Sequence, residues 1–259
     1  MYKTIELLKN GQLAYLTLNR PDQMNAINQV MMKELAEAFE SLKNDMTVQV
    51  VVIYGAGRMF SAGGDIQAML KPEGIDMKDV MNDLSRLAKA LYTLPQITIA
   101  AVGGAAAGLG FSLVLGCDRI VAEDSSKLAM NFIGIGLVPD GAGHFFLKER
   151  LGVSKAKQLI WSGEVLNAET ALEKGLVDEV VPAGQARDAA DKIAHQLLTK
   201  PIRAMIASKH ILHSQKVEEL DCVLEMESET QMKMRQTEEH QEGIRAFLEK
   251  RLPNFTKVK

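Results

Sequence analysis

Residues 97–143, ITIAAVGGAAAGLGFSLVLGCDRIVAEDSSKLAMNFIGIGLVPDGAG, are the stretch around which the rest of the chain is organised. They begin with a β-branched apolar run over 97–102, which predicts a buried strand. Glycines end this run, and a Gly-Leu-Gly segment over 108–110 leads into an apolar helix over 111–115. Such a helix start carries free backbone N–H groups that suit a developing negative charge. A tight crossover with glycines for packing alone is the alternative.

Length and composition indicate an ordinary globular protein. The chain has 259 residues, of which 47% are hydrophobic and 24% charged, so a substantial core can form. A net charge of −3 gives no electrostatic basis for binding nucleic acid. Cys117 and Cys222 lack the spacing of a zinc site or a disulfide framework. The first 16 residues do not resemble a signal peptide, and no apolar run is long enough for a bilayer. We therefore expect a cytoplasmic protein with no metal and no membrane or nucleic-acid partner.

Hydrophobic periodicity predicts an α/β chain that becomes purely helical towards its C-terminus. Strands are expected at 2–8, 13–18, 48–54, 97–102 and 177–181. Helices are expected after Asn28, over 76–92, from Ser154 to Trp161 and after Asn167, and then over 185–198, 201–213, 217–235 and 237–249. A loop is expected over 71–75.

Six different motifs follow one another along the chain: Leu18–Pro21 with Asn25–Ile27, Ser61–Ile66, Gly104–Asp118, Gly136–Gly143, Leu176–Val181 and Glu242–Arg251. In this order and spacing they resemble the enoyl-CoA hydratase/isomerase (crotonase) family. The resemblance implies an α/β fold, with a crotonase-like spiral of ββα units over 1–195 and a C-terminal helical trimerisation region over 196–259. It also implies an acyl-CoA thioester as substrate, with no cofactor beyond the coenzyme A that the substrate carries. A homotrimer or a dimer of trimers would be usual.

The resemblance also implies site residues. The family's oxyanion hole consists of two backbone N–H groups, which the resemblance maps onto Ala62 and Leu109. Preorganised donors of this kind stabilise the enolate formed when a proton leaves the carbon beside a thioester. The residues expected to contact the acyl-CoA are Asn25, Ala26, Ala62, Gly63, Gly64, Asp65, Ile66, Gly108, Phe132, Phe247 and Lys250. Phe247 and Lys250 would reach the nucleotide of a neighbouring subunit, although Lys250 equally fits a solvated helix end.

The chain departs from the hydratase pattern at the two positions where a hydratase has its catalytic glutamates. Where a typical hydratase of the family has two glutamates, this sequence has Ser112 and Phe132. The remaining acid is Asp140, which by the resemblance matches the carboxylate of the Δ3,Δ2-enoyl-CoA isomerase branch and of the ring-opening isomerase in phenylacetate breakdown. In a dry pocket lined by Phe132 and Ile133, its pKa would rise towards the working range of a base. As an N-cap of a helix beginning near residue 142, Asp140 would instead have a lowered pKa.

We therefore expect an enzyme that shifts a double bond in an enoyl-CoA, with Asp140 as its single base. The alternatives are a 2-enoyl-CoA hydratase of fatty-acid β-oxidation and a non-catalytic acyl-CoA-binding protein. His144 follows the acid closely, but a lone histidine at such a place is more often structural. The acyl group is expected to lie near Met81 and Leu84.

Overall fold

The computed structural model describes residues 2–66 and 76–257, so the loop expected over 71–75 lies outside the described residues. A six-stranded sheet has the order β1-β2-β3-β4-β6-β9, and a three-stranded sheet has the order β5-β7-β8. The pairs β1–β2 and β7–β8 are antiparallel, and the other pairs are parallel. The strands are β1 (Ile5–Asn10), β2 (Leu13–Leu18), β3 (Val50–Gly55), β4 (Ile97–Val102), β5 (Ala105–Ala107), β6 (Arg119–Glu123), β7 (Lys127–Ala129), β8 (Val165–Asn167) and β9 (Glu179–Val181).

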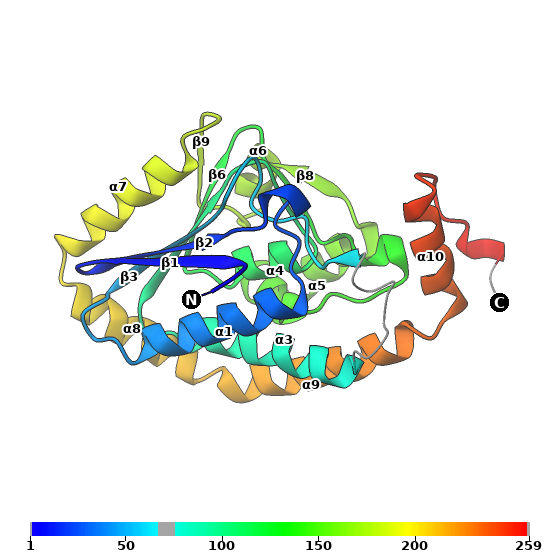
Figure 1. Cartoon of the computed structure of the whole chain (residues 1–259), viewed down its shortest axis with the longest axis horizontal. Helices are drawn as coiled ribbons and strands as arrows, with labels where there is room; N and C mark the ends of the chain where they lie inside the picture. Colours follow the sequence, from blue (N-terminus) through cyan, green and yellow to red (C-terminus); the bar gives the residue numbers. More distant parts are fainter. Residues whose placement is uncertain (1, 67–75, 258–259) are drawn as a thin grey trace.

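Helices cover both faces of the larger sheet (Figure 1). The helices within the described residues are α1 (Gln29–Lys43), α3 (Met77–Tyr92), α4 (Leu109–Leu115), α5 (Gly143–Ser162), α6 (Ala168–Glu173), α7 (Ala186–Leu198), α8 (Ile202–Ser214), α9 (Val217–Met234) and α10 (Glu238–Leu248). Short 3₁₀ turns occur at η1 (Pro21–Gln23), η2 (Asn131–Ile135) and η3 (Phe255–Lys257). In Figure 1, α7 lies across one side of the sheet, α1, α3 and α9 lie on the other, and α10 stands at the far end.

Two apolar layers hold the sheet between these helices. Every residue of β4 is buried, as expected for a central parallel strand covered on both faces. On one face, Ala186, Ala190 and Ala194 of α7 form a stripe that packs in one cluster with Val50 and Ile99. Small side chains at this spacing let the helix lie close to the strands. The larger core lies on the other face and includes the apolar residues of α1, α3 and α4.

Helix starts follow the local sequence signals closely. The Asn28 side chain accepts a hydrogen bond from the Met31 N–H at 2.9 Å and caps α1. Asp76 caps α3 in the same way, and so does Asn167 for α6. Each cap satisfies a backbone donor that has no partner within its helix. These predicted helices are confirmed.

The predicted short helix from Ser154 to Trp161 is confirmed. It is the second of two helical segments within α5, which are separated by non-helical backbone at Gly152, where φ is 72° and ψ is 161°. The strands β5, β6, β7 and β8 were not predicted. Three of them, β5, β7 and β8, have only three residues each, too few to show an alternating pattern.

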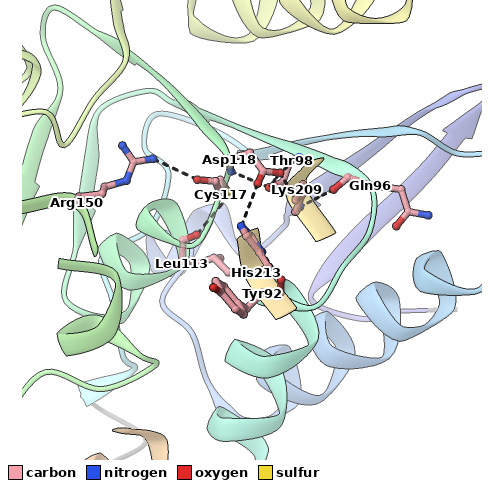
Figure 2. Close-up of polar contacts among 9 residues, drawn as sticks. All are labelled: Tyr92, Gln96, Thr98, Leu113, Cys117, Asp118, Arg150, Lys209 and His213. Carbon is pink, nitrogen blue, oxygen red and sulfur yellow. Dashed lines mark hydrogen bonds and ion pairs between the residues drawn. The ribbon is translucent and has the colours of Figure 1, made fainter. Parts of the chain in front are cut away.

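A polar cluster attaches α8 to the end of the sheet (Figure 2). Asp118 Oδ2 accepts hydrogen bonds from Thr98 N at 2.7 Å and from Lys209 Nζ at 2.6 Å. The ring of His213 stacks on that of Tyr92, with centroids 4.2 Å apart, and its Nδ1 lies 2.9 Å from the Tyr92 carbonyl oxygen. Because Lys209 is nearly buried, its charge depends on this carboxylate for compensation.

The two cysteines are not paired. Cys117 is buried within the same cluster, and burial raises the pKa of its thiol to about 12, so it stays protonated and inert. Cys222 is exposed. Over residues 2–66 and 76–257, no group of acids, histidines and cysteines is arranged to hold a metal ion. Within the same ranges, no helix has the length and apolar character needed to span a membrane.

Candidate active site

A cavity of about 140 Å³ lies where the loop after β3, the start of α4, the turn η2 and the loop before α5 meet. Its wall is mostly apolar and is completed by side chains of α1, α3, α9 and α10. The lining residues are Met32, Ala62, Gly63, Gly64, Ile66, Val80, Met81, Leu84, Gly108, Leu109, Asn131, Phe132, Ile135, Leu137, Asp140, Arg235 and Phe247. Most of the residues predicted for the site thus line one cavity, as do Met81 and Leu84.

Two backbone amides of the cavity wall are available to a ligand. Leu109 is the first residue of α4, so its N–H has no acceptor within the helix. Gly64 forms a parallel bridge with Ile27, in which Ile27 N donates to Gly63 O and Asp65 N donates to Ile27 O. In such a bridge the N–H of Gly64 itself points to the opposite side. Among the described residues, neither amide donates a hydrogen bond.

The amide of Ala62 is not available in this way. Its N–H donates to the carbonyl oxygen of Met24 at 3.0 Å. One N–H cannot serve that carbonyl and a substrate oxygen with good geometry at once. This hydrogen bond contradicts the predicted role of the Ala62 amide as an oxyanion donor, although Ala62 does line the cavity.

Asp140 is the single acidic residue among the described residues that line the cavity. It is only 5% exposed, and its Oδ2 accepts a hydrogen bond from Gln231 Nε2 at 2.8 Å. Its other oxygen, Oδ1, is buried and has no hydrogen-bond partner in the described part of the chain. Burial raises the pKa of Asp140 to about 7, opposed by the Gln231 hydrogen bond and assisted by the charge of Glu227.

The alternative role of Asp140 as a helix N-cap is wrong. The residue before α5 is Ala142, and no side chain of its own segment caps the helix. Glu227 of α9 provides the cap instead, accepting hydrogen bonds from Ala142 N at 2.8 Å and His144 N at 3.0 Å. The His144 ring also lies 2.8 Å from Glu227 Oε1 and does not line the cavity, so its role is structural.

The positions where a typical hydratase has its glutamates hold no acid or base. Ser112 is buried, and its Oγ donates to the backbone oxygen of Asp140 at 2.8 Å. Phe132 is 8% exposed and forms an apolar wall against Gly108, where an added Cβ would lie 3.6 Å from the ring. Ile133, predicted to line the pocket with Phe132, is 39% exposed and lies outside the lining.

Three residues predicted to contact the acyl-CoA do not line the cavity: Asn25, Ala26 and Asp65. Asn25 is fully buried, and its side-chain nitrogen donates to the carbonyl oxygens of Ala56 and Met59 at 2.8 and 2.9 Å. The predicted contact between Asn25 and coenzyme A therefore does not fit this structure. Arg20 ties the other two together, since it binds the carbonyl oxygen of Ala26 and forms an ion pair with Asp65 at 2.9 Å.

Phe247 lines the cavity of its own chain, whereas Lys250 lies just beyond α10 and outside the lining. Helix α10 packs closely against η2 at Gly243. A Cβ added there would lie 2.6 Å from the Cα of Ile135, so only glycine fits without a shift. The predicted contacts of Phe247 and Lys250 with the nucleotide of a neighbouring subunit stay a prediction.

Sequence reasoning missed the contribution of α9. Gln231 is completely buried against Asp140, and Arg235 at the end of the helix reaches the cavity. A signal was present, since the buried face of α9 runs from Leu220 and Leu224 into Glu227 and Gln231. Polar side chains that continue an apolar stripe need partners inside the protein.

Comparisons with known proteins identify the relatives of this chain. The family model described as enoyl-CoA hydratase/isomerase matches residues 9–258. The chain is 49% identical to the Bacillus subtilis protein named "Putative enoyl-CoA hydratase/isomerase YhaR", over 95% of this chain and 96% of that one. It is 35% identical to the 1,2-epoxyphenylacetyl-CoA isomerase of Escherichia coli, over 93% and 94%. The crystal structure of an enoyl-CoA hydratase from Mycobacterium avium subsp. paratuberculosis superposes with a TM-score of 0.89 at 32% identity, covering 99% and 100% of the two chains.

Proposed function

Because the chain belongs to the enoyl-CoA hydratase/isomerase (crotonase) family, we propose that it moves the double bond of an enoyl-CoA thioester from C3–C4 to C2–C3. The observation that carries this proposal is the cavity itself. One buried carboxylate, Asp140, shares it with two backbone amides that have no acceptor in the described part of the chain, and no second acid lies in the described lining. A double-bond shift needs one group that removes and returns a proton, whereas hydration also needs a positioned water.

The thioester carbonyl oxygen would lie at the amides of Leu109 and Gly64. When the proton leaves C2, negative charge develops on this oxygen, and two fixed N–H donors stabilise that charge without reorganisation. The N-terminal end of α4 adds its favourable dipole. Gly64 replaces Ala62 in this proposal, since the Ala62 amide already donates to Met24.

Asp140 acts as the base and then as the acid. It takes the proton from C2, and the C–H electron pair passes into the C1–C2 bond and the thioester oxygen, giving a dienolate. Asp140 then returns the proton to C4 while the C2–C3 double bond forms, so no other reactant is consumed. With its pKa at about 7, the carboxyl group can both accept and release a proton near neutral pH.

The surroundings of Asp140 support isomerisation over hydration. By the family resemblance, Phe132 and Ser112 stand where a typical hydratase has its two glutamates; Phe132 is an apolar part of the wall, and Ser112 donates its hydroxyl hydrogen to a backbone oxygen. Neither side chain can deliver water to C3. The apolar wall also excludes water from the dienolate, which strengthens its stabilisation by the amides.

The test is turnover of 3-hexenoyl-CoA to 2-hexenoyl-CoA, followed by the absorbance of the conjugated thioester. Asp140→Asn keeps the size of the side chain and removes the base, so kcat should fall by ~10²–10⁴-fold while coenzyme A still binds. Asp124→Asn, at an exposed position, is the matched control.

The same assay separates the alternatives. Wild-type turnover by Asp140→Asn would contradict the proposal. Hydration of crotonyl-CoA without isomerisation of 3-hexenoyl-CoA would favour a hydratase, and coenzyme A binding without any turnover would favour a non-catalytic binding protein.

A further inference from the structure

Three polar side chains of α9 follow one another at helical spacing against the active-site loop. Glu227, Gln231 and Arg235 are four residues apart, so they share one face of the helix. Glu227 is 4% exposed and Gln231 is 0% exposed, although both are polar. Glu227 and Gln231 find their partners in the segment between Asp140 and His144, and Arg235 lines the cavity beside it.

The backbone around Asp140 is fixed from two sides. Ser112 of α4 donates to the carbonyl oxygen of Asp140, and Glu227 holds the N–H groups of Ala142 and His144. With the main chain held, the remaining freedom of the carboxyl group is rotation of its own side chain. Gln231 removes this freedom through the 2.8 Å hydrogen bond to Oδ2.

The two carboxylate oxygens therefore differ. Oδ2 is occupied by an amide N–H, which can donate but cannot accept. Oδ1 is buried and has no partner among the described residues. A proton on the carboxyl group is accommodated better on Oδ1, because Oδ2 already receives a hydrogen. The charged and the neutral carboxyl group would thus present the same oxygen to the substrate.

We propose that Gln231 is a positioning residue that makes Oδ1 the one atom of Asp140 that takes the proton from C2 and returns it to C4. This inference rests on the proposed function. A single oxygen can transfer the proton at both carbons, on one face of the acyl chain, only if the carboxyl group does not rotate between the two steps. The amide of Gln231 supplies this restraint.

The main test replaces Gln231 by Met, which keeps the length of the side chain and removes the donor. Loss of the restraint should lower kcat by ~10²-fold, since small misplacement of a catalytic group is costly, with KM changed less than about threefold. The donor stabilises the ionised carboxylate, so its loss should also move the rising limb of the kcat–pH profile to higher pH. Glu227, Arg235 and His144 are the other charged or titratable groups that act on Asp140, and they are unchanged in this variant.

A second variant, Gln231→Glu, tests the donor itself. The introduced carboxyl group can donate a hydrogen bond to Oδ2 only while it is protonated. The variant should therefore be active when the two carboxyl groups together hold one proton. Activity should then exceed that of Gln231→Met at neutral pH and fall again at high pH, where the wild type stays on its plateau. Gln196→Met, at an exposed position of α7, is the control for the substitution.

Three outcomes would overturn the inference. If Asp140→Asn is inactive but Gln231→Met keeps the wild-type kcat and pH profile, the positioning role is wrong and the proposed function stands. If Asp140→Asn retains turnover, both are wrong. If Gln231→Met does not fold, a high-pH plateau in Gln231→Glu overturns the role of the donor.

Discussion

Glu227 caps helix α5 from a position 85 residues further along the chain than Ala142, whose N–H it accepts at 2.8 Å. A second hydrogen bond, from His144 N at 3.0 Å, shares the same carboxylate. The first turn of α5 thus takes its cap from α9 rather than from its own sequence. The cap also places a negative charge near Asp140, where it contributes to the raised pKa of that residue.

Glu227→Gln should therefore change both stability and pH dependence. The amide can accept one hydrogen bond but presents N–H groups to the second backbone donor, so we expect a loss of about 1–3 kcal/mol in the free energy of unfolding. Losing the like charge should lower the pKa of Asp140 and move the rising limb of kcat to lower pH, opposite to Gln231→Met. Urea unfolding and a kcat–pH profile measure the two effects. Exposed Glu225→Gln is the control, and unchanged unfolding would contradict the cap.

Two substitutions at Leu109 separate its amide from its side chain. Leu109→Pro removes the N–H at the first position of α4, where proline is compatible with a helix. Leu109→Ala removes a similar amount of packing and keeps the N–H. Relative to Leu109→Ala, kcat for 3-hexenoyl-CoA should be lower by ~10²–10³-fold in Leu109→Pro. Equal rates in the two variants, with similar circular dichroism, would remove this amide from the oxyanion site.

The polar cluster that attaches α8 to the sheet (Figure 2) should matter for stability and little for turnover, because none of its residues lines the cavity. Asp118→Asn would leave the nearly buried charge of Lys209 without its carboxylate, at a cost of about 1–3 kcal/mol, because Asp118 itself is open to solvent. The double variant Asp118→Asn with Lys209→Met should recover part of this loss. Denaturant unfolding of the two single variants and the double variant measures the coupling. Additive losses would show that the pair is not coupled.

Asp140 should make the protein less stable as pH rises through the acidic range. Its pKa is about 7 in the folded chain and about 3.9 when unfolded, so between these values the folded state holds a proton that the unfolded state has lost. The contribution of Asp140 to stability is thus fully present below about pH 4 and is lost by about pH 7. Asp140→Asn cannot titrate, so it should gain stability relative to wild type between about pH 5 and pH 7.5. A constant difference would show that the folded carboxyl group has an ordinary pKa.

Local chemistry explains what the sequence predicted well. Asn28, Asp76 and Asn167 start helices through bonds made within three residues, so their role needs no knowledge of the rest of the fold. The apolar run of β4 similarly predicts a central strand at the observed residues. Asp140 was singled out as the remaining acid in the central stretch, and the structure places it in the cavity.

What the sequence missed depends on contacts between distant segments. Whether Ala62 or Gly64 has a free amide is decided by the carbonyl of Met24 and by the bridge to Ile27, and neither is visible in the motif itself. The partner of Asp140 lies 91 residues away on α9. Its local trace is a buried polar position that continues the apolar stripe of Leu220 and Leu224, which says that a partner exists but not which one.

The distance along the chain between Asp140 and Gln231 has a consequence for synthesis. During translation Asp140 is made 91 residues before Gln231, the residue that binds its carboxylate. A ribosome-bound chain that ends before α9 could already pair its sheet and carry the carboxyl group, yet it would lack the amide and the cap that set its geometry. Catalytic competence would therefore be acquired late, after most of the sheet has been made.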